Sequence, residues 1–331
     1  DIGTGGFVGQ YGAREGVRMQ QFRIRNVFGP VPSRRLGRSL GVDLVPSKAC
    51  SYDCIYCQLG HTTEKTIERN EYVPMSDVLM ELEERLAAGA QADYITLSGS
   101  GEPTLHSCIG DIIRTIKTIT DIPVAVLTNG SLLWDPDVRR DLNAADLVIP
   151  SLDAGDAEAF ARINRPHGSI TFDTLVEGLV AFGDEYAGEI WLEVLLLAGI
   201  TATAQEAKKI ADCAKKIRTD RIQVGTVSRP PADVDACAAS LAVLETLADV
   251  FGPAAEVVQG FSGTLREHEY LAGRAGVLDL VQGRSHTLDE ISSSLVINRN
   301  ETLKLLEGLL NEGLVSSRIK RGERHFESVA L

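Results

Sequence analysis

The sequence predicts an α/β fold: a partial (β/α)6 barrel of parallel strands with a small C-terminal winged helix-turn-helix domain. Two observations carry this prediction. Between residues 41 and 230, short β-branched runs alternate with amphipathic stretches of helical period, which is the pattern of parallel strands joined by crossover helices. After residue 274, three short helical stretches precede two strand-like runs, an order typical of a winged helix.

Six strands are expected in the barrel, each a short apolar or β-branched run. They cover residues 41–45, 94–97, 124–127, 147–150, 190–197 and 222–227. Helical patterns lie between them at residues 75–88, 109–118, 172–182 and 204–217. Six units are fewer than the eight of a closed barrel, so we expect a barrel whose open side admits a larger substrate.

The chain divides into four parts on this interpretation. A flexible N-terminal tail is expected at 1–27, the barrel at 28–232, a helical edge or linker at 233–273 and the winged-helix domain at 274–331. In the last part we expect helices at 277–282, 287–295 and 300–311, and strands at 314–319 and 324–329. Thr287 and Glu290 predict a capping box for the second helix, and Asn300 an N-cap for the third.

Composition narrows the class of protein. A chain of 331 residues with 44% apolar residues can bury a substantial core, while its formal net charge of -13 repels a polyphosphate unless a local basic patch intervenes. The longest apolar stretch, near residues 191–200, is too short to cross a bilayer, so no membrane partner is expected. Six cysteines are too few for a disulfide framework, and three lie within eight residues, which indicates a metal site and a cytoplasmic, reducing location.

Those three cysteines, Cys50, Cys54 and Cys57, follow the first expected strand in an irregular loop. Their spacing lets three thiolates ligate three irons of a cubane and leaves the fourth iron open, as a catalytic site requires. The alternatives are a zinc site completed by His61, a redox dithiol that leaves Cys50 unexplained, or chance. Tyr56, directly before the last cysteine, is either a core aromatic or a residue that shields the cluster or flanks the base of a ligand.

The CxxxCxxC loop, with an aromatic residue before its last cysteine, resembles the radical S-adenosylmethionine (SAM) superfamily. Residues 28–37 and 164–167 are similar, more narrowly, to iron-sulfur oxidoreductases related to the tRNA wybutosine-synthesis enzymes, and the likeness covers residues 28–231. The resemblance implies a [4Fe-4S] cluster and SAM as cofactors, with SAM chelating the open iron. It also implies an external electron donor such as flavodoxin or ferredoxin, and a 5'-deoxyadenosyl radical that abstracts hydrogen from a substrate.

Polar residues follow three successive expected strands, where parallel α/β folds bind ligands. In the superfamily, a glycine-rich turn after the second strand receives the amino group of the cofactor. The matching turn here consists of Ser98, Gly99, Ser100, Gly101 and Glu102. Asn129 and Ser151 match positions of ribose or carboxylate contacts, and Asp153 is a further acceptor for ribose or substrate, although all three also suit helix caps.

Charged residues near the expected mouth are substrate candidates. The guanidinium groups of Arg34, Arg35, Arg165 and Arg229 suit a carboxylate or phosphate, with surface salt bridges as the alternative. Glu193 interrupts an apolar strand, and because a buried carboxylate must be paired or shift its pKa, we expect it to face the barrel interior.

Other reactive residues have ordinary structural interpretations. His106 and His167 lie near mouth loops but are expected to be simple hydrogen-bonded histidines rather than proton donors. Cys108, Cys213 and Cys237 are expected to be structural thiols, with a hydrogen-donor role as the alternative.

The expected activity is therefore that of a radical SAM enzyme, with the substrate open among three hypotheses. The wybutosine likeness and a basic wing at Arg318, Lys320, Arg321 and Arg324 favour tRNA modification, which the overall acidity opposes. A second hypothesis has the winged helix hold a peptide or protein substrate or form a dimer. A third is a redox regulator whose cluster senses redox state and whose winged helix binds DNA.

Overall fold

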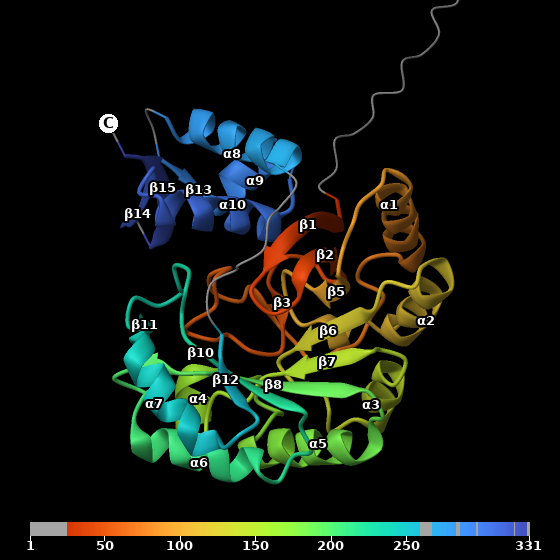
Figure 1. Cartoon of the computed structure of the whole chain (residues 1–331), viewed down its shortest axis with the longest axis vertical. Coiled ribbons are helices and arrows are strands. Elements are labelled where there is room, and N and C mark those ends of the chain that lie inside the picture. The colour runs from red at the N-terminus through yellow and green to blue at the C-terminus, as the bar shows by residue number, and fades with distance from the viewer. Residues whose placement is uncertain (1–24, 259–266, 283–284, 296, 321, 330–331) are drawn as a thin grey trace, which may run out of the picture.

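The computed structural model describes residues 25–258, 267–282, 285–295, 297–320 and 322–329. It has the expected α/β fold, built around a mostly parallel eight-stranded sheet (Figure 1). Nearly all of the tail expected at 1–27 lies outside the described residues.

The sheet begins with an antiparallel hairpin, β1 (Val27–Ser33) and β2 (Gly37–Asp43). Six strands parallel to β2 follow in chain order: β5 (Tyr94–Ser98), β6 (Val124–Thr128), β7 (Leu147–Pro150), β8 (Glu189–Leu195), β10 (Arg221–Gly225) and β12 (Ala255–Val257). The six expected parallel strands are present, and β12 adds a seventh in the stretch expected to be a helical edge or linker. Neither β12 nor β1 gave a strand signal, because β12 has three residues and β1 contains Pro30 and Pro32.

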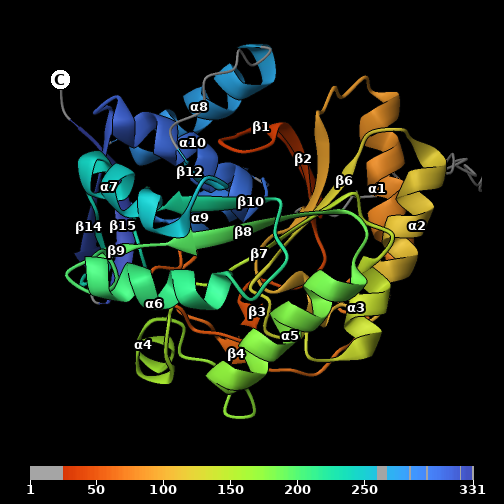
Figure 2. The ribbon, with the colours of Figure 1, turned by 60° about the horizontal axis from the view of Figure 1, so that its bottom comes forward.

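Helices flank the sheet. They are α1 (Met75–Ala87), α2 (Ile109–Ile119), α3 (Pro136–Leu142), α4 (Ala157–Ile163), α5 (Phe172–Glu185), α6 (Ala204–Ala214) and α7 (Leu241–Phe251). Figure 2 shows α1, α2, α3, α5 and α6 along the outside of the sheet. The four helices expected in this part agree with α1, α2, α5 and α6, whereas α3 and α4 have seven residues each, too few to show a helical period.

Strand alternation divides the core between the two faces of the sheet. Val124 and Val126 of β6 belong to the large buried cluster that includes the isoleucines of α2. Ala125, on the other face of β6, packs in a second cluster with Ile149 and Trp191. Ile149 and Leu127 of this cluster also line the cavity described below, so the cluster forms its apolar floor.

Two short pairings and one 3-10 turn complete this part. β3 (Ala49–Cys50) pairs with β4 (Glu64–Lys65), and β9 (Leu197–Ala198) pairs with β11 (Cys237–Ala238). The 3-10 turn is Pro103–Leu105. The first pairing fixes the entry and exit of the cysteine loop.

The C-terminal part contains α8 (Glu267–Val281), α9 (Leu288–Leu295) and α10 (Arg299–Asn311). A three-stranded antiparallel sheet accompanies them, in the order β13 (His286–Thr287), β15 (Glu323–Ser328) and β14 (Val315–Lys320). We call residues 267–329 the C-terminal unit, and it has its own buried cluster, including Val277, Leu306 and Phe326.

Capping in the C-terminal unit follows the sequence with one correction. The capping box is confirmed, since the Thr287 N–H donates to Glu290 at 2.8 Å and the Glu290 N–H donates to Thr287 Oγ1 at 3.2 Å. The expected N-cap of α10 is wrong: Asn298 caps the helix and accepts the N–H of Asn300 at 2.8 Å. Two asparagines lie two residues apart, and Arg299 between them already has helical conformation.

The C-terminal unit packs against the rest of the chain through α10, which lies beside β1 (Figure 1). Leu59 and Cys57 of the cysteine loop join the apolar cluster of the unit, and Asn298 Nδ2 donates to the Arg25 carbonyl at 3.2 Å. In the part of the chain that the structure describes, no helix has the length and apolarity to cross a bilayer.

Candidate functional site

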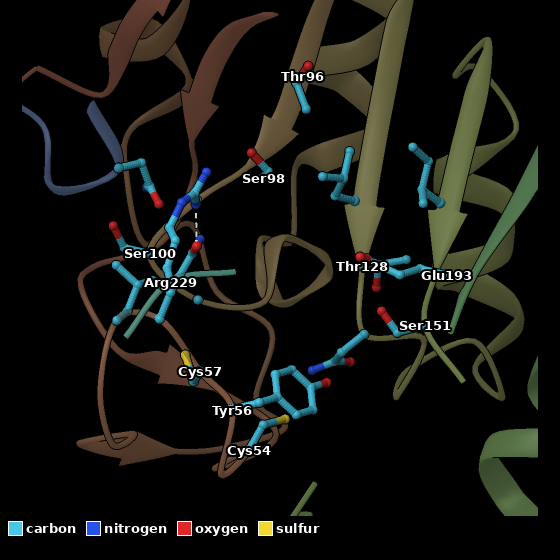
Figure 3. Close-up of a pocket in the computed structure, with 18 of the residues that line it drawn as sticks. Cys54, Tyr56, Cys57, Thr96, Ser98, Ser100, Thr128, Ser151, Glu193 and Arg229 are labelled. Atoms are coloured by element: carbon cyan, nitrogen blue, oxygen red, sulfur yellow. Dashed lines mark hydrogen bonds between the residues drawn. The ribbon is translucent and has the colours of Figure 1, made fainter. Parts of the chain in front are cut away.

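The carboxyl ends of the central strands open onto a cavity of about 370 Å³. A cavity of this size suits a small-molecule ligand or cofactor. In the view of Figure 3, Cys54, Tyr56 and Cys57 lie at one side, Thr128, Ser151 and Glu193 at the strand ends, and Arg229 across from those strand ends. The cavity therefore joins the cysteine loop to the polar strand ends that the sequence predicted.

All three loop cysteines are free thiols that line this cavity. Each sulfur has a side-chain nitrogen donor nearby: Asn129 Nδ2 lies 3.6 Å from Cys50, Asn164 Nδ2 3.5 Å from Cys54, and Lys48 Nζ 3.4 Å from Cys57. Burial raises the pKa of Cys50 to about 12 and the pKa of Cys54 well above its usual value, so these sulfurs bind as thiolates only when a metal replaces the proton. Three thiols with donors to stabilise thiolate charge fit an iron-sulfur cluster.

A single-ion site has no support in the geometry. Among the described residues, no group of three or more His, Cys, Asp or Glu side chains is arranged to hold one metal ion. His61, the fourth ligand in the zinc alternative, has its ring nitrogens 3.3 Å from Asp53 and 3.1 Å from Asp233. A cubane does not need the three sulfurs around one ion, because each thiolate binds a different iron.

The cysteine loop is held by residues 163–167, which include the Asn-Arg-Pro-His sequence noted above. Backbone hydrogen bonds run from Asp53 N to the Asn164 carbonyl at 3.0 Å, from Ile55 N to the Ile163 carbonyl at 2.9 Å and from His167 N to the Ser51 carbonyl at 2.8 Å. This segment therefore fixes the conformation of the loop on the side of Cys54.

Arg165, within that segment, was expected to contact substrate, and this contact stays a prediction. Its φ is 44°, and its guanidinium group pairs with Asp233 outside the cavity. The backbone pairing with the cysteine loop sets this direction, which the sequence alone does not reveal.

The glycine-rich turn after β5 packs against the chain itself. A Cβ at Gly101 would lie 1.8 Å from the Ala49 carbonyl oxygen, and at Gly99, where φ is 144°, it would lie 2.3 Å from Asp43 Oδ1. The Lys48 N–H donates to the Ser100 carbonyl at 2.7 Å. Both glycines are thus required by close approach to β2 and the cysteine loop, while Ser98 and the rest of the turn still line the cavity.

Asp43 is a buried carboxylate that the sequence did not single out. It ends β2, accepts the Ser100 N–H at 3.0 Å and the Ser100 hydroxyl, and also bonds to Asn298 of the C-terminal unit. Burial raises its pKa to about 6. Asp43 is the last of five consecutive buried residues of β2, and its partners Ser100 and Asn298 are distant in the sequence, so the local pattern did not reveal its role.

Glu102 is the centre of a hydrogen-bond network at the ends of β5 and β6. One carboxylate oxygen accepts from Thr104 N at 3.0 Å, Thr104 Oγ1 at 2.6 Å and Thr128 Oγ1 at 2.6 Å, and the other from Asn129 N at 2.8 Å. Burial raises its pKa. These four bonds account for the carboxylate within the chain, and direct contact with a cofactor stays a prediction.

The next two strand ends differ in what they present. Ser151 lines the cavity, and its backbone forms an isolated parallel β-bridge with Glu193 of β8. Asp153 does not line the cavity: it accepts from the Tyr56 hydroxyl, from Asn164 Nδ2 at 3.1 Å and from Leu195 N at 3.0 Å. Burial raises its pKa to about 6. Asp153 thus has structural partners behind Tyr56, and its expected ribose or substrate contact stays a prediction.

Basic side chains form another wall of the cavity. Arg34 and Arg35 come from the turn between β1 and β2, Arg229 follows β10, and Lys304 comes from α10. Arg35 pairs with Glu193, as expected for an interior carboxylate, and Arg229 pairs with Glu307 of α10 at 2.7 Å. Lys304 was missed, because nothing in the sequence connects the C-terminal unit to the barrel mouth.

The remaining reactive residues lie away from the cavity. His106 is buried, with Nε2 2.8 Å from the Val73 carbonyl, and burial lowers its pKa. Cys213 belongs to the main apolar cluster, Cys237 is exposed and Cys108 precedes α2. Of the three thiols expected to be buried, Cys213 is buried, whereas Cys108 is half-buried and Cys237 is exposed.

Comparisons with known proteins concern the family and the fold of the chain. Residues 44–223 match the family model described as "Radical SAM superfamily". The chain is 34% identical over 294 residues to a UPF0026 protein of Methanocaldococcus jannaschii, covering 86% of this chain and 90% of that one. It is 37% identical over 305 residues to a protein of Brachyspira hyodysenteriae named GTPase Obg, covering 91% of this chain and 45% of that one, so it spans about half the length of that relative.

Two solved structures share the fold. A radical SAM methyltransferase from Sphaerobacter thermophilus superposes with a TM-score of 0.53 at 16% identity, over 66% of this chain and 65% of that chain. TYW1 with a lysine-pyruvate adduct bound superposes with a TM-score of 0.50 at 15% identity, over 65% and 72%. At these identities the likeness concerns the fold alone.

Proposed function

The chain belongs to the radical SAM superfamily and to the group of UPF0026 proteins, and from this premise we propose that it cleaves S-adenosylmethionine reductively, with Cys50, Cys54 and Cys57 as ligands of the cluster. Proteins of this superfamily are enzymes that bind a [4Fe-4S] cluster and SAM. The observation that carries the residue assignment is that these three thiols line one cavity and that each has a nitrogen donor at 3.4–3.6 Å.

When bound, the cluster and SAM supply a 5'-deoxyadenosyl radical, given an electron from an external donor such as flavodoxin or ferredoxin. The chain itself positions the cofactors and excludes water from the cavity. Asn129, Asn164 and Lys48 donate to the three sulfurs and orient the loop. The turn at residues 98–101 offers backbone groups and hydroxyls to the amino acid moiety of SAM, and Ser151 offers a hydroxyl to its ribose or carboxylate.

We further propose that the sheet is a partial barrel and that the C-terminal unit is a winged helix. Support for the first is that β1 and β12 are edges of the sheet within the described residues. Support for the second is the set of three helices with an antiparallel three-stranded sheet. The pairing of β12 with β10 favours assigning residues up to 258 to the barrel domain, with the winged-helix domain near the predicted 274–331.

A substrate-binding role for the C-terminal unit is favoured over nucleic-acid recognition. In a helix-turn-helix protein the recognition helix must enter the major groove, and here α10, the third helix, directs Asn300, Lys304 and Glu307 toward the cavity side. The basic wing is also largely paired, since Arg318 forms an ion pair with Glu327 and Arg324 donates to Ser317 at 3.1 Å. Arg321 lies outside the described residues.

The test is anaerobic reconstitution with iron and sulfide, reduction with dithionite, and mass spectrometry of 5'-deoxyadenosine and methionine. We expect wild-type protein to form both products and Cys50→Ala, Cys54→Ala and Cys57→Ala to form neither and to bind less iron. Cys237→Ala is the matched control, because this exposed thiol lies away from the cavity. Wild-type protein that forms no 5'-deoxyadenosine, or a Cys54→Ala variant that still forms it, contradicts the proposal.

A further inference from the structure

The basic wall of the cavity consists of Arg34, Arg35, Arg229 and Lys304. These four residues come from three segments that are far apart in the chain, and they meet in a protein whose formal net charge is -13. A positive cavity in an acidic protein is not explained by composition. It points to a ligand of opposite charge.

The acidic residues near this wall already form ion pairs with two of its arginines. Glu193 pairs with Arg35, and Glu307 pairs with Arg229, whose side chain is only 8% exposed. Arg229 also donates to the Gln58 side-chain oxygen. Arg34 is half-buried and forms no hydrogen bond or ion pair among the residues that the structure describes, so Glu193 and Glu307 act on it only through longer-range electrostatics.

Bringing these cations together without further negative charge costs free energy. Burial and the neighbouring Arg229 lower the pKa of Arg34, and the same two causes, in the same order, lower the pKa of Lys304 to about 7. An anion placed among them would relieve both effects. SAM does not meet this need, because its sulfonium and ammonium groups outweigh its single carboxylate.

We propose that the basic wall binds the phosphate or carboxylate group of a small-molecule substrate, with Arg34 and Lys304 as direct ligands and Arg35 and Arg229 held in place by Glu193 and Glu307. The assignment deepens the proposed function and rests on it for the reaction, but the binding of an anion can be measured separately. The low exposure of Arg229 and the cavity volume of about 370 Å³ favour a small molecule over a polymer backbone.

Under this assignment the C-terminal unit completes the substrate site. α10 supplies Lys304 to the wall, and its Glu307 fixes the guanidinium group of Arg229 through two contacts at 2.7 Å. The two residues lie one helical turn apart, so a single helix face both binds the substrate anion and positions a second ligand.

The experiment measures binding of sulfate and of succinate to the reconstituted, anaerobic, SAM-loaded protein by isothermal titration calorimetry, at an ionic strength held constant with chloride. Sulfate stands for a phosphate group, because it is a tetrahedral dianion whose charge does not change between pH 6 and pH 8. We expect one site per chain, and affinity at least about tenfold lower in Arg34→Gln and in Lys304→Met. Arg34→Lys should restore part of it.

Arg38→Gln is the matched control, because Arg38 lies on the same hairpin but pairs with Asp93 at 2.7 Å outside the cavity. It should bind both anions as the wild type does. Sulfate should also bind more tightly at pH 6 than at pH 8, because Lys304 is protonated below its pKa of about 7. The charged groups that face Lys304 are Arg34, Arg35, Arg229 and Glu307. Lys304→Met should lose this pH dependence.

A preference for sulfate would assign a phosphate-bearing substrate, and a preference for succinate a carboxylate-bearing one. Equal affinity of wild type and Arg34→Gln for both anions, or no binding by the wild type, overturns the inference. If the wild-type protein cleaves SAM but binds neither anion, the inference about the basic wall is refuted and the proposed function stands. If sulfate binds through Arg34 but no 5'-deoxyadenosine forms, the proposed function is refuted and the anion site stands.

Discussion

Glu102 offers a sharp test of whether the network at the strand ends holds the cysteine loop. In Glu102→Gln only one side-chain oxygen remains, so the new amide group must face either the Asn129 N–H or the donors from Thr104 and Thr128. Loss of a charge-assisted bond costs about 1.5–3 kcal/mol and an unsatisfied buried N–H about 1–3 kcal/mol. Removing a buried charge returns part of this, because burial had raised the pKa of Glu102.

We therefore expect Glu102→Gln to lower the free energy of unfolding by about 2–4 kcal/mol. The assay is urea denaturation of the reduced apoprotein followed by circular dichroism, together with iron content after reconstitution. Iron content should also fall, since Asn129 joins the Glu102 network to Cys50 and Ser51.

Glu81→Gln is the matched control. Glu81 is also buried and accepts three hydrogen bonds, from Asn26 N, Asn26 Nδ2 and Val27 N, but it lies between α1 and β1, away from the cavity. It should lose stability and keep its iron. The reasoning is refuted by a Glu102→Gln protein within about 0.5 kcal/mol of wild type, or by equal loss of iron in both variants.

Two further changes test the cysteine loop directly. Gly101→Ala places a methyl group 1.8 Å from the Ala49 carbonyl oxygen and should sharply lower the urea midpoint and the iron content. Gly168→Ala is the control, because its methyl group meets no atom within 4 Å, and it should change neither quantity. Equal behaviour of the two variants would contradict the packing argument. Lys48→Met removes the donor to Cys57 and should make the cluster potential more negative by about 60 mV in an electron paramagnetic resonance redox titration. Lys65→Met, which removes an exposed donor to the Arg165 carbonyl, should leave the potential unchanged, and an unshifted Lys48→Met would rule out tuning by Lys48.

The sheet was largely predictable because its central strands are uniform apolar runs whose ends carry turn residues. The two edge strands were not, since β1 contains a Gly-Pro pair and a second proline and β12 is three residues long. Similarly, α3 and α4 are held by Asp135 and Asp156, which accept N–H groups of the first turn, rather than by a long apolar stripe. Elements this short have too few residues to show a period, and β12 is defined by its pairing with β10, which a local pattern does not contain.

The cysteine loop was predictable for a different reason: its spacing is local and encodes the metal chemistry. The superfamily resemblance drawn from it is confirmed by the match over residues 44–223. Asp153 and Arg165 have partners that the sequence did not reveal: Asp153 accepts from Tyr56 and Asn164, Arg165 pairs with Asp233, and neither lines the cavity. Asp43 and Lys304 were missed, since each becomes part of the site only through long-range packing.

The C-terminal unit contacts the site on two sides, so it connects the cysteine loop to the basic wall. Asn298 bonds to Asp43, which in turn holds the glycine-rich turn, while Leu59 and Cys57 of the cysteine loop pack into the apolar cluster of the unit. Glu307 and Lys304 complete the opposite wall. Because Asn298 caps α10 and the same helix carries both of these side chains, a shift of that helix would disturb the support of the cysteine loop and the basic wall together. Under the proposed function we therefore expect cofactor binding and substrate binding to be coupled through α10.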